Sequence, residues 1–224
     1  MLSAQTYCAG DQVSMEHQLQ EFVVCYESSA YEVGDTVKLA DFNGDLNGGN
    51  YYVIFIAMEV SWHYIPNNYN QTEEGEQYWE ENPNVIFLTA INELYQPYSC
   101  EQIGNLGIIG IPLVFEDPNS FMFDLFHSNT SWGAVVPSYV LIDHNMIVRG
   151  KPYPYNQNNP NGYSCNGNND LFYDWDGGST NDFIQQILDE FIPGCTNPAA
   201  CNYNSDATED DGSCEYYDEC GVCG

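Results

Sequence analysis

The chain has 224 residues, and 43% of them are hydrophobic, which is enough for one well-packed domain with a small appendage. Its 33 acidic residues stand against Lys38, Arg149 and Lys151, so the formal net charge is −30. Nucleic acids and anionic membranes are bound through Lys and Arg, so this charge argues against both as partners.

Nine cysteines are many for a chain of this size and are typical of an exported protein that keeps them as disulfides. No apolar run is long enough for a transmembrane helix, so we expect no membrane span. Residues 1–5 resemble the small-residue end of a signal peptide. We therefore expect a fragment of a secreted or cell-surface protein, with the periplasm as another possible location.

The chain divides by composition into an N-terminal segment (1–32), a main domain (33–192) and a Cys- and Asp-rich tail (193–224). The N-terminal segment is polar with short apolar groups. Cys8 and Cys25 lie close together in it, so we expect them to form a disulfide that closes a hairpin-like cap; two free thiols are the alternative.

The main domain begins with the pattern of a βαβ unit. Residues 51–57 and 84–91 are continuous β-branched and aromatic runs, each typical of a strand buried on both faces. Between them, residues 71–82 favour a helix. This order predicts two parallel strands joined by a right-handed crossover.

Further elements follow in chain order. They are a short helix capped by Ser99, an extended piece at 111–115, a helical turn or two at 121–126, a strand at 138–142 with a hairpin partner at 146–149, a long loop at 152–178 that holds Cys165, and an amphipathic helix beginning at Ser179 and Thr180.

Three local patterns resemble the thioredoxin superfamily, and most of all its exported redoxin branch of TlpA-like and peroxiredoxin-like domains. They are residues 41–44 with the strand at 51–57 and Ser61-Trp62, residues 110–118, and residues 135–143. The resemblance spans roughly residues 33–192. It implies an α/β fold with a central mixed sheet flanked by helices, and it places Pro137 at the family's cis-proline.

The chain departs from this family at its redox motif. Members carry W-C-x-x-C at the start of the first helix, where the first cysteine is the attacking thiolate. Here Trp62 is present, but His63 and Pro66 occupy the two cysteine positions. Because no cysteine lies between Cys25 and Cys100, standard dithiol exchange at this site is excluded.

One catalytic alternative uses Cys100 as a lone reactive thiol and His63 as its base, because both follow strands that end at one sheet edge. The competing interpretation, which we favour, is a Cys100–Cys165 disulfide that anchors the long loop. His63 is otherwise an inert substituted position or a metal ligand. The spacing of the four histidines gives little support for zinc.

The tail resembles a module, G-C-T-x-P-x-A-x-N-Y-N-x-x-A-x-x-D-D-G-S-C, that is found on secreted and surface proteins of marine bacteria. So short a segment needs disulfides or a metal to become ordered, and Cys195, Cys201 and Cys214 are expected in disulfides. Cys220 and Cys223 form a C-x-x-C that we expect to be structural. Calcium is one candidate, and the oxygen ligands available for it are Asn202, Asn204, Asp206, Asp210 and Asp211; a plain disulfide-stapled linker is the alternative.

These patterns favour a non-catalytic, or at most vestigially redox, thioredoxin-like module. It would bind a protein or peptide in the groove of the fold, would require no cofactor, and would attach to a surface or matrix through the tail. The rival hypothesis is a thiol oxidoreductase or peroxidase that uses Cys100. A third is a purely structural surface or matrix domain.

Overall fold

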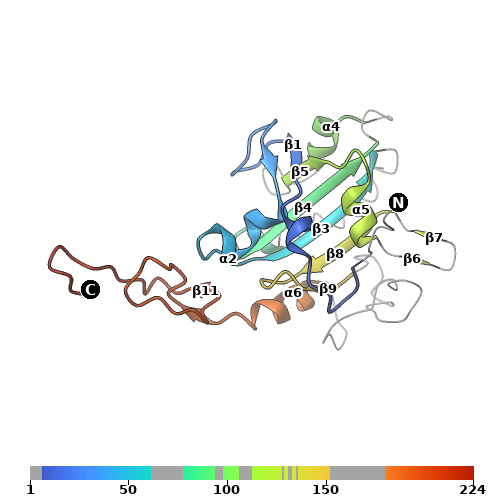
Figure 1. The fold of residues 1–224 in the computed structure, drawn as a ribbon. Helices are drawn as coiled ribbons and strands as arrows, with labels where there is room; N and C mark the ends of the chain where they lie inside the picture. The colour runs from blue at the N-terminus through green and yellow to red at the C-terminus, as the bar shows by residue number, and fades with distance from the viewer. Residues whose placement is uncertain are drawn as a thin grey trace.

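The structure is a computed structural model, and it describes residues 7–61, 78–93, 98–105, 113–127, 129–130, 133–134, 136–151 and 180–224. Its centre is a seven-stranded mixed sheet in the order β2-β1-β5-β4-β3-β8-β9 (Figure 1). The strands of this sheet are β1 (Phe22–Tyr26), β2 (Thr36–Val37), β3 (Val53–Val60), β4 (Val85–Asn92), β5 (Leu113–Glu116), β8 (Ser138–Ile142) and β9 (Val148–Gly150).

The three inner strands β3, β4 and β5 run parallel. β3 pairs with β4 along its whole length, from Val53 opposite Val85 to Val60 opposite Asn92, and β4 pairs with β5. The two apolar runs therefore form parallel neighbouring strands, as predicted. The helix predicted at 71–82 lies mainly outside the described residues.

Helices cover both faces of the sheet. Alternate residues of β3 point to opposite faces, so Ile54, Ile56 and Met58 pack in one apolar core while Val53 and Phe55 pack in another. The first core includes α5 (Phe121–Phe126), and the second includes α6 (Thr180–Leu188). Both helices fall where the sequence predicts them.

The N-terminal segment is part of the same sheet. β1 pairs antiparallel with β5 on one side and with β2 on the other. Three short helices follow or flank these strands, namely α1 (Met15–Gln18), η1 (Leu39–Phe42) and α2 (Gly44–Asn47). Tyr7 and Val13 are buried in the core under α5.

At the opposite edge, β8 pairs antiparallel with both β3 and β9, which confirms the predicted hairpin. An ion pair between the buried Arg149 and the exposed Glu190 joins this hairpin to the residues just after α6. The Arg149 guanidinium donates two hydrogen bonds to the Glu190 carboxylate, at 2.7 and 2.8 Å, and one to Asp143 at 3.3 Å. Arg149 is 1% exposed.

The tail after α6 extends away from the sheet as an arm (Figure 1). It holds the short parallel pair β10 (Pro193–Gly194) and β11 (Glu209–Asp210). Two disulfides, Cys195–Cys214 and Cys201–Cys223, close it, and Cys220 is a free exposed thiol. The arm contacts the body where Thr196 lies against Gly49, just after α2.

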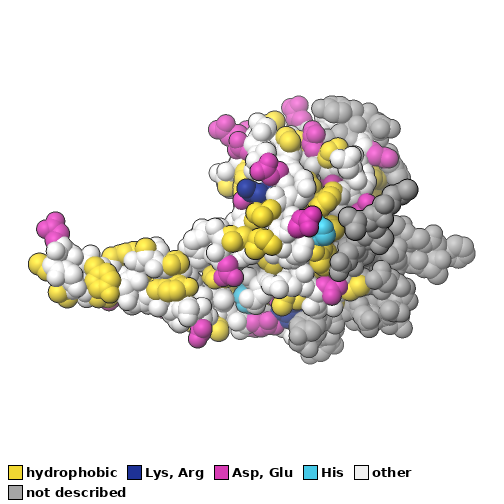
Figure 2. Space-filling model, viewed as in Figure 1, with side chains coloured by type: hydrophobic (Ala, Val, Ile, Leu, Met, Phe, Trp, Pro, Cys, Tyr) yellow, Lys and Arg dark blue, Asp and Glu magenta, His cyan; other side chains and the backbone are white. Residues whose placement is uncertain are grey.

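Two more short strands, β6 (Asn129–Thr130) and β7 (Gly133–Ala134), form a separate antiparallel pair after α5. No helix of the described residues is long and apolar enough to cross a membrane. Acidic side chains are scattered over the visible face of the body rather than gathered in one patch (Figure 2).

Candidate functional site

A cavity of about 180 Å³ lies where β3 and β4 end, beside the first turn of α5. The carboxyl ends of parallel strands are the usual place for a ligand in an α/β sheet. We call it the edge cavity. Its lining residues are Met58, Glu59, Val60, Ala90, Asn92, Glu93, Asp117, Ser120, Phe123 and Val136.

The register between β3 and β4 explains why most of these residues lie together at the cavity. Met58 lies opposite Ala90 and Val60 opposite Asn92 in the parallel ladder. Met58 and Ala90 belong to the core under α5, so all four side chains face that helix. Phe123 closes the cavity from the helix side, which gives it mostly apolar walls.

Hydrogen bonds fix the polar part of the edge cavity. Asn92 accepts from the backbone N–H of Glu93 at 2.7 Å, and its amide group bonds to the hydroxyl of Ser120. The buried Ser61 hydroxyl donates to the carbonyl oxygen of Glu93 at 2.6 Å. Glu93 and Ser120 both have a φ of 53°, in the left-handed region that is uncommon for residues other than glycine.

Asp117 caps α5 from outside the helix. Its carboxylate accepts from the N–H groups of Phe121, Met122 and Phe123 at 2.7, 3.2 and 3.3 Å. Burial raises the pKa of Asp117 by more than these three donors lower it. Because the carboxylate caps the helix, Asp117 holds the first turn of α5 in place and adds negative charge to the cavity wall. It does not offer its oxygens to a ligand.

Glu59 borders the edge cavity, but its side chain lies on the other face. It pairs with Ile91, whose side chain packs with Val114 and Ile103 away from α5. Burial raises the pKa of Glu59 to about 8, and no hydrogen bond or ion pair joins it to the residues that the structure describes. Glu59 therefore keeps its proton at neutral pH.

The motif-equivalent residues fall on both sides of the described boundary. Trp62, His63 and Pro66 lie outside the described residues. Pro137 is buried next to Val136 at the edge cavity, and the peptide bond between them is cis, as the resemblance predicted.

Cys100 is bonded to Cys25, with 5.8 Å between their Cα atoms. The expected Cys8–Cys25 and Cys100–Cys165 disulfides are therefore wrong. So is the hypothesis of a lone reactive thiol, because Cys100 is 5% exposed and its sulfur is already bonded. Cys8 is also disulfide-bonded, whereas Cys165 lies outside the described residues.

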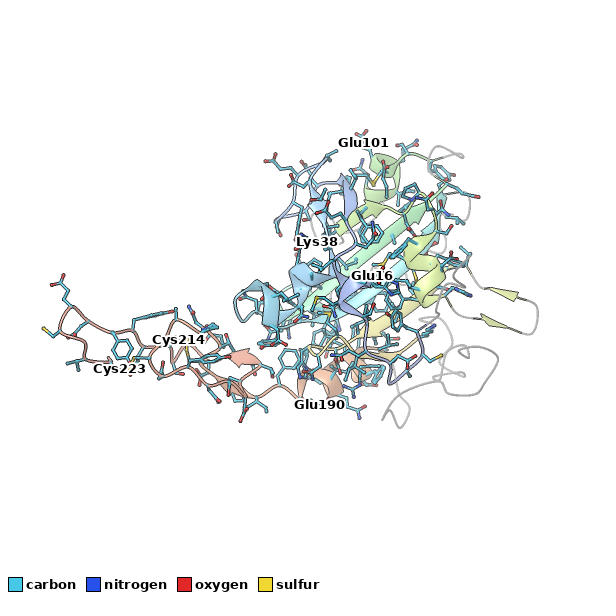
Figure 3. All side chains as sticks on the ribbon, viewed as in Figure 1. Glu16, Lys38, Glu101, Glu190, Cys214 and Cys223 are labelled. Carbon is cyan, nitrogen blue, oxygen red and sulfur yellow. A yellow bond between two sulfur atoms is a disulfide. The ribbon has the colours of Figure 1, made fainter. Side chains whose placement is uncertain are left out.

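The reason for the Cys25–Cys100 pairing is the place of β1 in the sheet. β1 lies beside β5, and α4 (Cys100–Gly104) packs against both strands. Ser99 caps α4 as predicted, in a reciprocal pair of hydrogen bonds with Gln102. A second hollow of about 330 Å³, here named the disulfide hollow, lies over this bond; it is lined by Val23, Val24, Cys25, Val33, Gly34, Ser99, Cys100, Glu101 and Glu116. Figure 3 labels Glu101, which follows Cys100 in α4.

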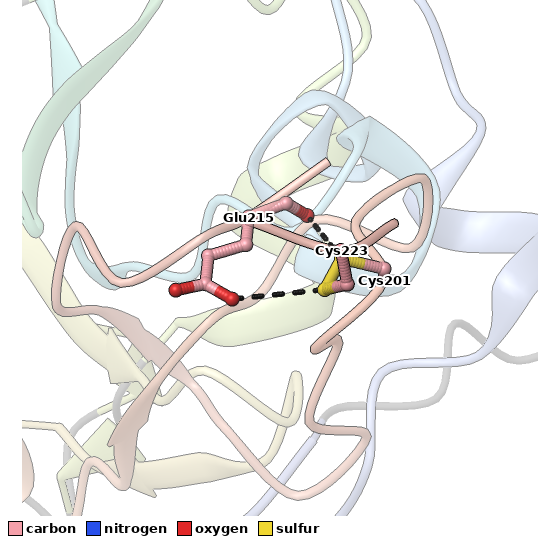
Figure 4. Close-up of side chains that lie close together, drawn as sticks. All are labelled: Cys201, Glu215 and Cys223. Carbon is pink, nitrogen blue, oxygen red and sulfur yellow. Dashed lines mark hydrogen bonds between the residues drawn. A yellow bond between two sulfur atoms is a disulfide. The ribbon is translucent and has the colours of Figure 1, made fainter. Parts of the chain in front are cut away.

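In the tail, the candidate calcium ligands hold turns. Asn202 accepts from the N–H of Glu215 at 2.8 Å, Asp210 from that of Gly212 at 3.2 Å, and Asp211 from that of Ser213 at 2.9 Å. Asn204 does the same for Asp206. Within the described residues, one group brings three ligand atoms close together, and it consists of Cys201, Glu215 and Cys223 (Figure 4). Two of those atoms are the sulfurs of a disulfide, so the group offers no metal site in this form.

Sequence reasoning missed Asn92, Asp117, Ser120 and Glu59 at this edge. Glu59 carried a readable signal, since it is a carboxylate two residues after the apolar run at 51–57. The other three became visible only when the ladder and α5 brought them together.

No family model matches the chain, and no curated protein matches it. Several solved structures are similar in fold. A secreted disulfide oxidoreductase of Mycobacterium tuberculosis, described as homologous to E. coli DsbE, shares 11% identity over 60% of this chain and 84% of its own, with a TM-score of 0.42. An exposed lipoprotein thioredoxin from Streptococcus pneumoniae shares 14% identity over 76% of this chain and 98% of its own, with a TM-score of 0.41.

A thiol:disulfide interchange protein from Chlorobium tepidum shares 11% identity over 82% of this chain and 96% of its own, with a TM-score of 0.43. Because these identities and TM-scores are low, the fold is assigned from the topology of the chain itself. The chain's own topology has parallel β3, β4 and β5, the antiparallel pair β8 and β9, and helices on both faces. This chain has a thioredoxin-like fold with a small disulfide-closed tail.

Proposed function

We propose that this protein is an exported, non-catalytic thioredoxin-like module that binds an extended peptide segment at the carboxyl edge of its sheet. The observation that carries the proposal is the edge cavity, which opens at this edge and has no cysteine among the described residues that line it. A cavity at this edge whose described lining offers no thiol supports recognition without thiol–disulfide exchange.

The chemistry of the cysteines supports the same proposal. Dithiol exchange needs two thiols a few residues apart at the helix start, and the sequence offers His63 and Pro66 there. Cys100, the next cysteine along the chain, is used to tie α4 to β1.

Export is part of the proposal. Seven of the eight cysteines in the described residues are disulfide-bonded, and such bonds persist in oxidising compartments. The strongly acidic composition favours solubility outside the cell. The tail would then attach the module to a surface or matrix.

The test pairs two substitutions of valine. Val60→Trp narrows the edge cavity, whereas Val23→Trp adds the same bulk at the disulfide hollow. Peptides selected from a random library on the full chain should lose binding with Val60→Trp and keep it with Val23→Trp. An insulin-reduction assay should give no turnover above the uncatalysed rate. Turnover by the wild-type chain, or binding that is lost only with Val23→Trp, contradicts the proposal.

We also propose calcium as a ligand of the tail, since five oxygen-bearing side chains lie within ten residues there. Calorimetric titration of the full chain tests it, with an Asp206→Asn, Asp210→Asn, Asp211→Asn triple variant as the comparison. Heat and a rise in melting temperature in the wild type alone support calcium. Identical titrations of both proteins leave the tail as a disulfide-stapled linker.

A further inference from the structure

The edge cavity has the size of one side chain. Its volume of about 180 Å³ is below the roughly 300–1,000 Å³ of small-molecule sites. Met58, Val60, Ala90, Phe123 and Val136 supply apolar walls around it. A ligand side chain that enters needs an aliphatic stem to fill this space.

The charge around the cavity has one sign. Among the described residues, its lining includes Glu93 and Asp117 and contains no Lys, Arg or His. The three cations of the chain lie elsewhere: Arg149 is held by Glu190 and Asp143, Lys151 donates to the carbonyl of His127, and Lys38 lies 3.8 Å from Glu21. The acidic side chains at this edge therefore favour a ligand that carries a positive charge.

A metal ion fits the arrangement poorly. A divalent ion requires several oxygens that converge on one point. Within the described residues, the acidic side chains at the cavity form no group of three or more whose oxygens come close enough together to share an ion. Asp117 is also committed to capping α5. An organic cation, whose charge sits at the end of a flexible stem, makes no such demand.

We propose that the edge cavity recognises a lysine side chain of the bound peptide, with the four-carbon stem against Met58, Val60 and Phe123 and the ammonium group near the exposed carboxylate of Glu93. This inference rests on the proposed peptide-binding function. Lysine combines an apolar stem with a compact charge that stays near water. The net charge of −30 steers such a basic segment toward the protein.

The direct test compares four nonapeptides that differ only at the central residue: lysine, norleucine, Nε-acetyllysine and glutamate. Norleucine keeps the aliphatic stem and lacks the ammonium group. Binding to the full chain is measured by fluorescence anisotropy at constant salt. The lysine peptide should bind at least tenfold more tightly than the norleucine peptide, and glutamate most weakly.

Variants locate the effect. Glu93→Gln should lower the affinity for the lysine peptide to about that for the norleucine peptide. Glu101→Gln, which removes an exposed carboxylate at the disulfide hollow, should leave both affinities unchanged. Ala90→Leu fills the cavity and should weaken the binding of both peptides. If Ala90→Leu fails to fold, Val60→Leu, at a half-buried position, replaces it and should also weaken the binding of both peptides.

Equal affinity of the lysine and norleucine peptides, or a lysine preference that survives Glu93→Gln, overturns this inference but leaves peptide binding intact. Failure of every library peptide to bind overturns the proposed function itself. The two failures are therefore distinguishable.

Discussion

The Sγ atom of Cys25, the last residue but one of β1, is bonded to the Sγ atom of Cys100, the first residue of α4. The two residues are 75 positions apart, so the bond ties the N-terminal strand to a helix that follows β4. It closes a long loop and so restricts the unfolded chain.

Replacing both residues by serine should lower the free energy of unfolding by about 2–4 kcal/mol, a typical cost for losing one disulfide. Denaturant unfolding measures it. Cys220→Ser, which removes the free thiol, serves as the control and should leave the free energy unchanged. Equal stability of the double variant and the control would show that β1 is held by the sheet alone.

Arg149 and Glu190 lead to a second prediction. Burial alone lowers the pKa of Arg149, but Glu190 and Asp143 raise it above its usual value, so it stays charged. Arg149→Met should cost about 3–5 kcal/mol, because it leaves the carboxylate of Asp143 buried without its cation. Arg149→Lys keeps the charge but loses the paired bonds, so an intermediate loss is expected. A stable methionine variant would contradict the ion pair as the link between β9 and the end of α6.

The contact between the tail and the body can be tested at two neighbouring glycines. Gly48 and Gly49 have φ angles of 92° and 97°, so alanine costs about 1–2 kcal/mol of backbone strain at either position. A Cβ on Gly48 meets open space, but one on Gly49 would lie 2.2 Å from the carbonyl oxygen of Thr196.

Gly49→Ala should therefore release the tail while Gly48→Ala does not. Limited proteolysis of the two variants, with cleavage near residue 193 followed by mass spectrometry, measures the difference. Equal cleavage rates would mean that Thr196 does not hold the tail against α2.

Local patterns in the sequence were enough to predict β3, β4, α5 and α6, because continuous apolar runs and an amphipathic stripe specify burial directly. The cysteine pairing could not be predicted this way. Cys8 and Cys25 are close in sequence, but β1 lies beside β5 and α4, which places Cys100 next to Cys25 instead. Distance along the chain says little about which strands become neighbours.

The same limit applies to the edge cavity. The apolar pattern ends at Ala57, whereas β3 continues to Val60 because its backbone still pairs with β4 up to Asn92. Within this extension, the side chains of Met58 and Val60 face the cavity, and the cap formed by Asp117 completes its wall. Because the charged Glu59 interrupts the apolar run between them, the role of Met58 and Val60 follows from the pairing of β3 with β4 rather than from the sequence pattern.

Glu59 makes the stability of the fold depend on pH. Burial raises its pKa from 4.5 to about 8 in the folded protein, while the unfolded chain releases the proton near the lower value. Between these two pH values the folded state holds one proton more than the unfolded state, so each unit of rising pH lowers the free energy of unfolding by about 1.4 kcal/mol.

Glu59→Gln keeps the shape of the side chain and cannot ionise. Its stability relative to the wild type should therefore rise steadily from pH 5 to pH 8 and level off above, by a few kcal/mol in all. Chemical denaturation at unit pH intervals measures this difference, and Glu101→Gln controls for the loss of a surface carboxylate. Because the side chain of Glu59 faces away from the edge cavity, peptide binding at pH 7 should be unchanged by Glu59→Gln. A stability difference that does not vary with pH would show that Glu59 ionises as freely in the folded protein as in the unfolded chain.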